Sequence, residues 1–217
     1  MALKVCVLAS GSAANCVFVS SAATGVLIDA GLSGRETERR FATLGLPLTA
    51  VQAVCLTHEH DDHRTALGVL HQRHGLRLYA NAGTIEAVER GRKLKDVAWQ
   101  VFATGVPFTI GDLTLEPFSV PHDSYDPVGF VVTCGASRVG VVTDMGMATS
   151  LVRQRLSGCQ ALVLESNHDE DMLRNWPGPG RSNSASWAGR ATCPTRKRAN
   201  CWAAWEGPSC AMYFWRT

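Results

Sequence analysis

The chain has 217 residues, 46% hydrophobic and 18% charged, which is ordinary for a globular protein and long enough for one domain with a sizeable core. Its eight cysteines are scattered without a Cys-x-x-Cys pair, and no apolar stretch approaches the roughly 20 residues that cross a bilayer, which argues against a thiolate zinc cage, a disulfide scaffold and a membrane span. The formal net charge of +2 comes from the end of the chain, because residues 1–175 carry 15 basic and 18 acidic side chains whereas residues 176–217 carry six and one.

Strand and helix signals alternate through residues 1–165. Segments enriched in β-branched residues and bounded by Gly, Pro or Asn predict strands at 4–9, 16–20, 26–30, 53–57, 76–80, 97–102, 113–119, 129–134, 139–144 and 161–165. Segments with helical spacing predict helices at 35–44, 65–74, 84–91 and 149–157. This order indicates a layered α/β fold in which strands dominate.

Polar residues stand where several predicted strands end. They are Asp29, His58, His122, Asp144 and Glu165. In layered α/β folds, functional side chains tend to lie at strand ends, where a rigid sheet directs them into a shared crevice. We therefore expect these side chains to converge, although an Asp or His in such a place is also a common turn former.

Residues 58–63 read HEHDDH and contain three histidines and three acids. Imidazole nitrogens and carboxylate oxygens are ligands of divalent metal ions, and here they follow a predicted strand in what we expect to be a short turn. Clustering three imidazoles without a metal brings no evident stabilisation, so a metal site is favoured over a solvated polar loop. Two divalent ions held close together activate water, which makes hydrolysis the expected reaction class.

This cluster resembles the His-x-His-x-Asp-His motif of the metallo-β-lactamase superfamily. Further segments are similar to the branch of cytoplasmic hydrolases called YycJ or WalJ-like: LASGSAANC, VLIDAGLS, SVPHDSYDPVGFVV, VVTDMG and LVLESNHDEDML. The resemblance covers about residues 3–175. It implies a cytoplasmic protein with a four-layer αββα sandwich, metal ions at one edge of its two sheets, and a C-terminal part that is incomplete in this chain.

The resemblance also implies a set of metal ligands around two divalent ions, zinc or manganese, in the intact family. The family pattern assigns His58, His60 and His122 to the first ion. It assigns Asp62 and His63 to the second ion and Asp144 to the bridge between the two. The family supplies one more histidine to the second ion from a downstream Gly-His-Leu-Ser-like motif. No histidine of this chain lies beyond His168, so a single bound ion is the alternative expectation.

Two acids are expected to take part in catalysis, and a third to support them. Asp62 would hold the second ion and orient the attacking water, and Asp144 would set the spacing between the ions. Asp29 would hydrogen bond to the histidine loop and fix its shape, because residues around metal ligands orient them. The alternative for Asp29 is a plain turn aspartate.

Further candidates lie in two other segments. Ser12 and Asn15 belong to the loop SGSAAN, which could offer hydroxyl and amide groups to a phosphate, although it lacks a Walker lysine and the Gly-x-Gly-x-x-Gly spacing. The family shows a second Gly where Ala14 stands, which puts a tight backbone approach there in doubt. His168 follows a predicted strand, and its expected role is to support the metal site or to contact the substrate.

The last segment of the chain differs from the rest. Residues 176–217 contain no Leu, Ile or Val but hold five of the six tryptophans. Disordered extensions are poor in Trp and Cys, so this composition favours a GC-rich gene read out of frame from near residue 175. We expect a hydrolase domain at 1–175 and an aberrant basic tail at 176–217 that is not natively folded.

The expected function is hydrolysis of phosphodiester bonds in DNA, because the branch that the chain resembles is associated with exonuclease action. The body of the chain is slightly acidic, so any groove for nucleic acid has to be local. Two alternatives stay open. One is a small-molecule hydrolase on the same scaffold, such as a thioester or lactone hydrolase, and the other is an inactive truncated product with an incomplete second metal site.

Overall fold

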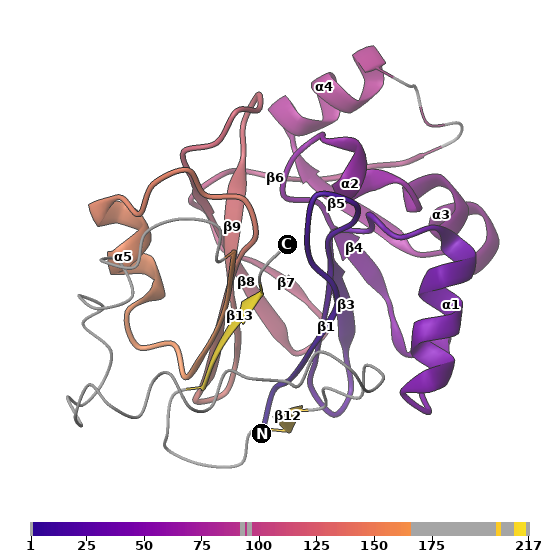
Figure 1. Ribbon diagram of the computed structural model, residues 1–217, viewed down its shortest axis with the longest axis horizontal. Helices are drawn as coiled ribbons and strands as arrows, with labels where there is room; N and C mark the ends of the chain where they lie inside the picture. The colour runs from indigo at the N-terminus through magenta and orange to yellow at the C-terminus, as the bar shows by residue number, and fades with distance from the viewer. Residues whose placement is uncertain (1, 92–93, 95–96, 166–202, 205–210, 216–217) are drawn as a thin grey trace.

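The fold consists of two β-sheets packed face to face, with helices on both outer sides (Figure 1). The computed structural model describes residues 2–91, 94, 97–165, 203–204 and 211–215. Helices α1 to α4 cover one sheet and helix α5 covers the other. This arrangement is the four-layer αββα sandwich that the sequence predicts.

The first sheet, as far as it is described, has seven strands in the order β12-β1-β2-β3-β4-β5-β6. Their bounds are β1 (Lys4–Ala9), β2 (Cys16–Ser20), β3 (Gly25–Ile28), β4 (Ala53–Cys55), β5 (Arg77–Asn81), β6 (Gln100–Phe102) and β12 (Ala203–Ala204). Strands β1 to β3 pair antiparallel, and β3 to β6 pair parallel. Parallel neighbours need a crossover, which accounts for the helices after β3, β4 and β5.

The second sheet has six strands within the described residues, in the order β13-β11-β10-β9-β8-β7. Their bounds are β7 (Phe108–Ile110), β8 (Leu113–Ser119), β9 (Val128–Cys134), β10 (Ser137–Val142), β11 (Ala161–Glu165) and β13 (Ala211–Trp215). Strands β7 to β10 form an antiparallel meander, and β11 pairs parallel with β10 after the crossover through α5.

The helices begin and end at residues that suit those positions. Their bounds are α1 (Gly34–Thr43), the 3₁₀ turn η1 (Leu48–Ala50), α2 (Asp61–Arg64), α3 (Leu67–His74), α4 (Ala82–Gly91) and α5 (Ser150–Leu156). The hydroxyls of Ser33 and Thr149 accept hydrogen bonds from backbone amides in the first turns of α1 and α5. Helix α3 ends at Gly75, whose φ of 67° is open to glycine without a Cβ penalty.

The alternation of side chains along the strands builds three apolar layers. In β2, Val17 and Val19 point between the sheets, whereas Phe18 points toward the helices and meets Phe41 of α1 with ring centroids 5.0 Å apart. In β9, Phe130 lies between the sheets and Val131 faces α5. Both faces of each central strand are therefore buried.

The predicted elements agree with the structure except in a few places. All ten predicted strands and all four predicted helices are present, and four strands have the predicted bounds. Strand β7 and the 3₁₀ turn η1, with three residues each, were not predicted, and the region expected to be a short turn in the histidine cluster includes a helical turn, α2. Three or four residues are too few to show a periodicity, which explains these differences. Strands β12 and β13 were not predicted either, because the segment after residue 175 was expected not to fold natively.

The predicted boundary near residue 175 and most of the segment 176–217 lie outside the described residues. Within that segment, strand β12 pairs with β1 and strand β13 pairs with β11. The frameshift and the division into a domain and an aberrant tail stay predictions. Among the helices that are described, none is both long enough and apolar enough to cross a membrane.

Phe130 gives a test of the layer between the sheets. It is fully buried and its ring centroid lies 5.6 Å from that of Phe102. Replacing it in Phe130→Ala removes this packing and leaves a cavity, so we expect the free energy of unfolding in urea to fall by about 3–5 kcal/mol. Val101→Ala, at a position 65% exposed on β6, is the control and should change it by about 0.5 kcal/mol or less. Equal losses in the two variants would contradict the four-layer packing.

Candidate metal centre

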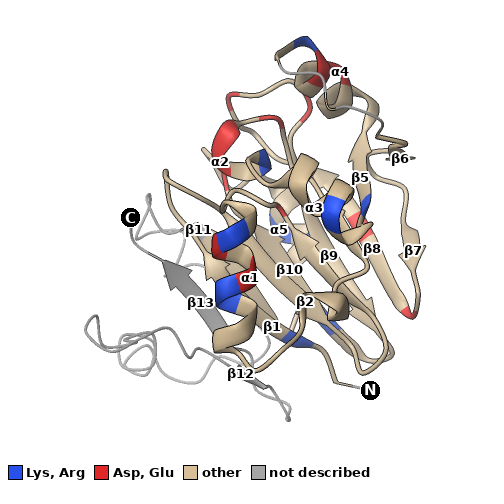
Figure 2. Cartoon of the chain, turned by 90° about the vertical axis from the view of Figure 1, so that its right-hand side faces the viewer, with Lys and Arg blue, Asp and Glu red and all other residues tan. Residues whose placement is uncertain are grey.

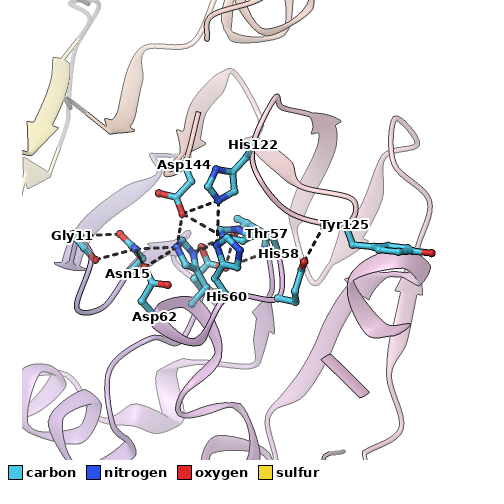
Figure 3. Close-up of polar contacts among 12 residues, drawn as sticks. Gly11, Asn15, Thr57, His58, His60, Asp62, His122, Tyr125 and Asp144 are labelled. Atoms are coloured by element: carbon cyan, nitrogen blue, oxygen red, sulfur yellow. Dashed lines mark hydrogen bonds and ion pairs between the residues drawn. The ribbon is translucent and has the colours of Figure 1, made fainter. Parts of the chain in front are cut away.

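The ends of four strands bring polar side chains to one edge of the sandwich (Figure 3). Asp29 follows β3, His58 follows β4, His122 follows β8, and Asp144 follows β10. Strands β3 and β4 belong to the first sheet, and β8 and β10 belong to the second. The two sheets therefore each contribute to one cluster, which contains four of the five polar strand endings; the side chain of the fifth, Glu165, lies outside the described residues.

Helix α2 gives the histidine cluster its local shape. His60 is the N-cap residue of α2, and its side chain makes no capping hydrogen bond, which leaves its imidazole available to the cluster. Asp61 and Asp62 occupy the first turn, where the helix dipole favours negative charge. His63 follows in the same turn and is fully buried.

Backbone hydrogen bonds tie the loops of the two sheets together. The amide of Val128 donates to the carbonyl of Thr57 at 3.1 Å, which joins β9 to the end of β4. The amide of Gly146 donates to the carbonyl of Pro121 at 2.9 Å, which joins the Asp144 loop to the His122 loop. These bonds fix the loops that carry the candidate ligands relative to one another.

Four donors converge in the first group of possible ligands, made of His58, His60, His122 and Asp144. Nδ1 of His60 lies 3.1 Å from Nε2 of His58 and 3.2 Å from Nε2 of His122. Oδ2 of Asp144 lies 3.3 Å and 3.8 Å from the same two Nε2 atoms. Ligands of a tetrahedral zinc ion at its usual bond lengths are separated by about 3.3 Å, so the donor set fits a divalent metal ion.

The second group shares one residue with the first. It consists of Asp62, His63 and Asp144. Nε2 of His63 lies 2.7 Å from Oδ2 of Asp144 and 3.4 Å from Oδ2 of Asp62. The same oxygen of Asp144 thus faces both groups, which is the geometry of a carboxylate that can bridge two ions.

Asp29 lies beneath the histidine loop and is fully buried. Its Oδ1 accepts a hydrogen bond from the amide of Thr57 at 2.8 Å, and its Oδ2 lies 2.8 Å from Nδ1 of His63. A carboxylate cannot donate, so Nδ1 of His63 carries a proton, and Nε2 is the nitrogen that faces the second group. The hydroxyl of Thr57 donates its hydrogen to Asp29, so at 2.9 Å from Nδ1 of His58 it acts as an acceptor, and Nε2 of His58 faces the first group.

Asn15 supports the second group from the loop between β1 and β2. Its Nδ2 lies 3.0 Å from Oδ2 of Asp62 and 2.9 Å from Nε2 of His63, and its Oδ1 accepts a hydrogen bond from the amide of Gly11 at 3.1 Å. Its own amide donates to the carbonyl of Asp62 at 2.7 Å. The side chain and the backbone of Asn15 therefore both hold Asp62 in place.

The carboxylates around His63 favour a positive charge at this position. Burial lowers the pKa of His63, but the negative charge of Asp29 and hydrogen bonds to Asp144, Asp29 and Asp62 outweigh burial and raise its pKa to about 12. A metal ion bound at Nε2 would meet the same electrostatic demand as a proton. The donor set is thus poised to take up a cation.

The pKa values of Asp144, Asp62 and His122 are shifted toward the protonation states that metal binding needs. Burial raises the pKa of Asp144, but hydrogen bonds with His58 and His63 outweigh burial and hold it below its ordinary value. The pKa of Asp62 is also lowered, because its hydrogen bond and charge interaction with His63 outweigh its burial. Burial and repulsion from His58 lower the pKa of His122. Ionised carboxylates and neutral imidazoles are the forms that bind metal ions.

Of the remaining predicted site residues, Ser12 is described and His168 is not. Ser12 is exposed on the loop between β1 and β2, and no hydrogen bond joins it to the cluster in the described part of the chain. His168 lies outside the described residues. The roles suggested for both stay predictions.

Two residues that neighbour the ligands were not predicted as site residues. Thr57 links Asp29 to His58, and Glu59 accepts a hydrogen bond at Oε1 from the amide of Tyr125 at 2.9 Å. Both lie next to expected ligands, which is the only signal that could have drawn attention to them. A hydroxyl or carboxylate in such a loop is otherwise an ordinary turn residue.

The chain is similar to proteins of a known family. The family model described as "Beta-lactamase superfamily domain" matches residues 24–193. Exodeoxyribonuclease YycJ of Bacillus anthracis is 38% identical over 176 residues, which cover 80% of this chain and 66% of that protein. Exodeoxyribonuclease WalJ of Streptococcus pneumoniae serotype 2 is 31% identical over 175 residues, covering 79% of this chain and 65% of that protein. The chain thus spans about two thirds of the length of these relatives.

The fold also has solved counterparts. The metallo-β-lactamase fold protein YhfI of Bacillus subtilis superposes with a TM-score of 0.65 at 20% identity, covering 78% of this chain and 73% of that one. Zn²⁺-bound PqqB of Methylobacterium extorquens superposes with a TM-score of 0.62 at 22% identity, covering 79% and 76%. At these identities the likeness concerns the fold.

Asp29→Asn tests the support beneath the histidine loop. Asparagine tolerates the φ of 64° found at this position, but it has one acceptor oxygen where Asp29 uses two, so either Thr57 or His63 loses its partner. We expect the affinity for Zn²⁺ or Mn²⁺, measured by calorimetric titration, to fall about 10–100-fold. Asp112→Asn is the control. Asp112 lies between β7 and β8 and accepts a hydrogen bond from Ser21, which follows β2 at the edge of the sandwich opposite to the metal centre. Unchanged affinity in Asp29→Asn would contradict the role given to Asp29.

Gly31→Ala tests the close approach of two backbones beside the cluster. A Cβ at residue 31 would lie 1.6 Å from the carbonyl oxygen of Asp62, so the start of α2 has to move. We expect metal affinity to fall at least about tenfold, because the ligands of the second group move with it. Gly68→Ala in α3 is the control, since its Cβ would make an ordinary contact 3.5 Å from Leu94. Equal metal affinity in the two variants would show that the loop can shift without consequence.

Proposed function

Because this chain belongs to the β-lactamase superfamily domain family, we propose that it is a metal-dependent hydrolase that cleaves phosphodiester bonds in DNA. The two curated relatives described above are named exodeoxyribonucleases and are 38% and 31% identical to it. The chain spans about two thirds of their length, so the proposal rests on the residues of its own site as well as on the names of these relatives.

The observation that carries the proposal is the position of Asp144 between two sets of donors. Its Oδ2 faces His58 and His122 on one side and His63 on the other. Two divalent ions in these places would make a water molecule nucleophilic near neutral pH and would neutralise charge on a phosphoryl oxygen. Imidazole and carboxylate donors suit zinc and manganese, and we propose one of these two metals.

The residues of the chain then have separate roles. Asp62, held at Oδ2 by Asn15, can accept a hydrogen bond from the attacking water and orient it toward the phosphorus. Asp29 keeps the proton of His63 on Nδ1 and so prevents this imidazole from changing tautomer. Asp144 sets the spacing of the two donor groups. Only three donors of the second group lie within the described residues, and a single ion at the first group is the alternative.

The distribution of charge suits a local contact with a polynucleotide better than a continuous groove. Figure 2 shows acidic residues at α2 and both signs of charge on α1 and α4. Arg39 and Arg64 are paired with Glu36 and Asp61. These two arginines are therefore not free for phosphate, and we propose that the metal centre supplies most of the phosphate binding. A cytoplasmic location, which the resemblance to cytoplasmic hydrolases suggested, belongs to the same proposal.

His122→Ala tests the proposed activity. It removes one imidazole of the first group, and we expect the rate of cleavage of labelled single-stranded and duplex DNA in Mn²⁺ or Zn²⁺ to fall at least about 100-fold, since each 1.4 kcal/mol of lost transition-state stabilisation is worth a factor of ten. His74→Ala is the matched control, because His74 pairs with Glu38 on the surface of α3 at 2.9 Å. A chelator should abolish cleavage by the unsubstituted protein.

The same preparations should be assayed with a chromogenic thioester. Hydrolysis of the thioester without cleavage of DNA would contradict the proposed substrate and favour a small-molecule hydrolase. A protein that binds metal but hydrolyses neither substrate would favour an inactive product with an incomplete site. Equal rates of DNA cleavage in His122→Ala and His74→Ala would show that the first group is not the catalytic centre.

A further inference from the structure

Tyr125 is an exposed aromatic residue beside the metal centre. It lies three residues after His122, and 56% of its surface is exposed. Figure 3 shows its ring on the far side of the histidine cluster from Asp144, directed away from the ligands. A single exposed aromatic side chain is ordinary in itself, so its fixed position and its neighbours decide whether it can bind a partner.

The backbone of Tyr125 is hydrogen bonded to the histidine cluster at residues 58–63. Its amide donates to Oε1 of Glu59 at 2.9 Å, and Glu59 stands between His58 and His60. Oε2 of Glu59 is buried and has no hydrogen-bond partner among the described residues, so the bond to Tyr125 is the one that holds this carboxylate. Tyr125 is therefore fixed in position relative to the first group of ligands.

The end of β5 and the start of α4 support the other side of the loop that contains Tyr125. The side chain of Asn81 donates from Nδ2 to the carbonyl of Asp126 at 2.8 Å. At Gly83, a Cβ would lie 2.7 Å from Cβ of Asp126 and 3.1 Å from Cδ1 of Tyr125. The absence of a side chain at Gly83 thus lets the loop and the aromatic ring lie against the first turn of α4.

Arg90, at the other end of α4, places a positive charge over the ring. Its Cζ lies 5.5 Å from the centroid of Tyr125, within the range of a cation–π contact. Arg90 also pairs with Glu86 one turn earlier, which holds the guanidinium near the ring. The result is a rigid aromatic surface with a cation beside it, adjacent to a metal centre.

We propose that Tyr125 and Arg90 form a stacking platform for an unpaired base of the DNA strand whose scissile phosphate lies at the metal centre. The inference rests on the proposed function and names the feature of the substrate that this part of the site recognises. Every base has a flat π face, so an aromatic platform binds single strands without regard to sequence. The guanidinium of Arg90 attracts the neighbouring phosphate.

The charge of the chain makes such a platform useful. Residues 1–175 carry 18 acidic and 15 basic side chains, so release of counterions from DNA contributes little to affinity. Stacking does not depend on net charge, and it acts on a base that has left the duplex. The platform therefore selects strand ends or single-stranded segments over paired DNA.

The test measures binding of a short single-stranded oligonucleotide with hydrolysis-resistant phosphorothioate linkages by fluorescence anisotropy, using the full chain with Mn²⁺. Tyr125→Ala is expected to raise Kd about tenfold, whereas Tyr125→Phe, which keeps the aromatic face, should stay within about twofold. Arg90→Gln should weaken binding. It should also lower the slope of log Kd against the logarithm of the salt concentration by about one, because one phosphate contact is lost. Val106→Ala, at a position that is also 56% exposed, is the matched control.

An abasic scan makes the test specific to stacking. A single abasic site is moved along the oligonucleotide, and for the unsubstituted protein one position should weaken binding about tenfold. In Tyr125→Ala that position should lose its effect. The same sensitivity to the abasic site in both proteins, or an unchanged Kd in Tyr125→Ala, would overturn the platform while leaving the proposed function intact. Absence of DNA binding and cleavage by the unsubstituted protein would overturn both.

Discussion

The contact between Asp29 and His63 is the interaction on which the metal centre depends. A fully buried carboxylate is stable only when it is hydrogen bonded, and Asp29 meets this need with the amide of Thr57 and with Nδ1 of His63. Its φ of 64° is uncommon for a residue other than glycine, and such strain typically costs about 1–3 kcal/mol. These hydrogen bonds offset the strain and, at the same time, set the direction of the imidazole lone pair.

The two sheets bring together donors that are far apart in the chain. The first sheet delivers the histidine cluster after β4, and the second delivers His122 and Asp144 after β8 and β10. Backbone bonds from Val128 to Thr57 and from Gly146 to Pro121 connect these loops directly. Because apolar side chains fill the space between rigid sheets, the loops at this edge have little freedom, and the donor groups stay in place.

Electrostatics at this edge set a condition for substrate binding. Three carboxylates, of Asp29, Asp62 and Asp144, lie within contact of His63 and would repel a phosphate. Cations in the two donor groups would reverse that repulsion, so metal uptake and affinity for a phosphodiester are coupled in the proposed enzyme. The exposed ring of Tyr125 offers a contact that does not depend on this balance.

The sequence alone determined the layered fold and the kind of chemistry at the site. Strand and helix signals are local, and the cluster at 58–63 places imidazoles and carboxylates in one short segment, so both could be predicted from neighbouring residues. The tertiary structure alone decided that one oxygen of Asp144 faces both donor groups, that Asn15 holds Asp62, and that Glu59 anchors Tyr125. These contacts join residues from 47 to more than 80 positions apart. Their geometry follows from how two sheets pack and where their strands end, and no local pattern in the chain contains that information.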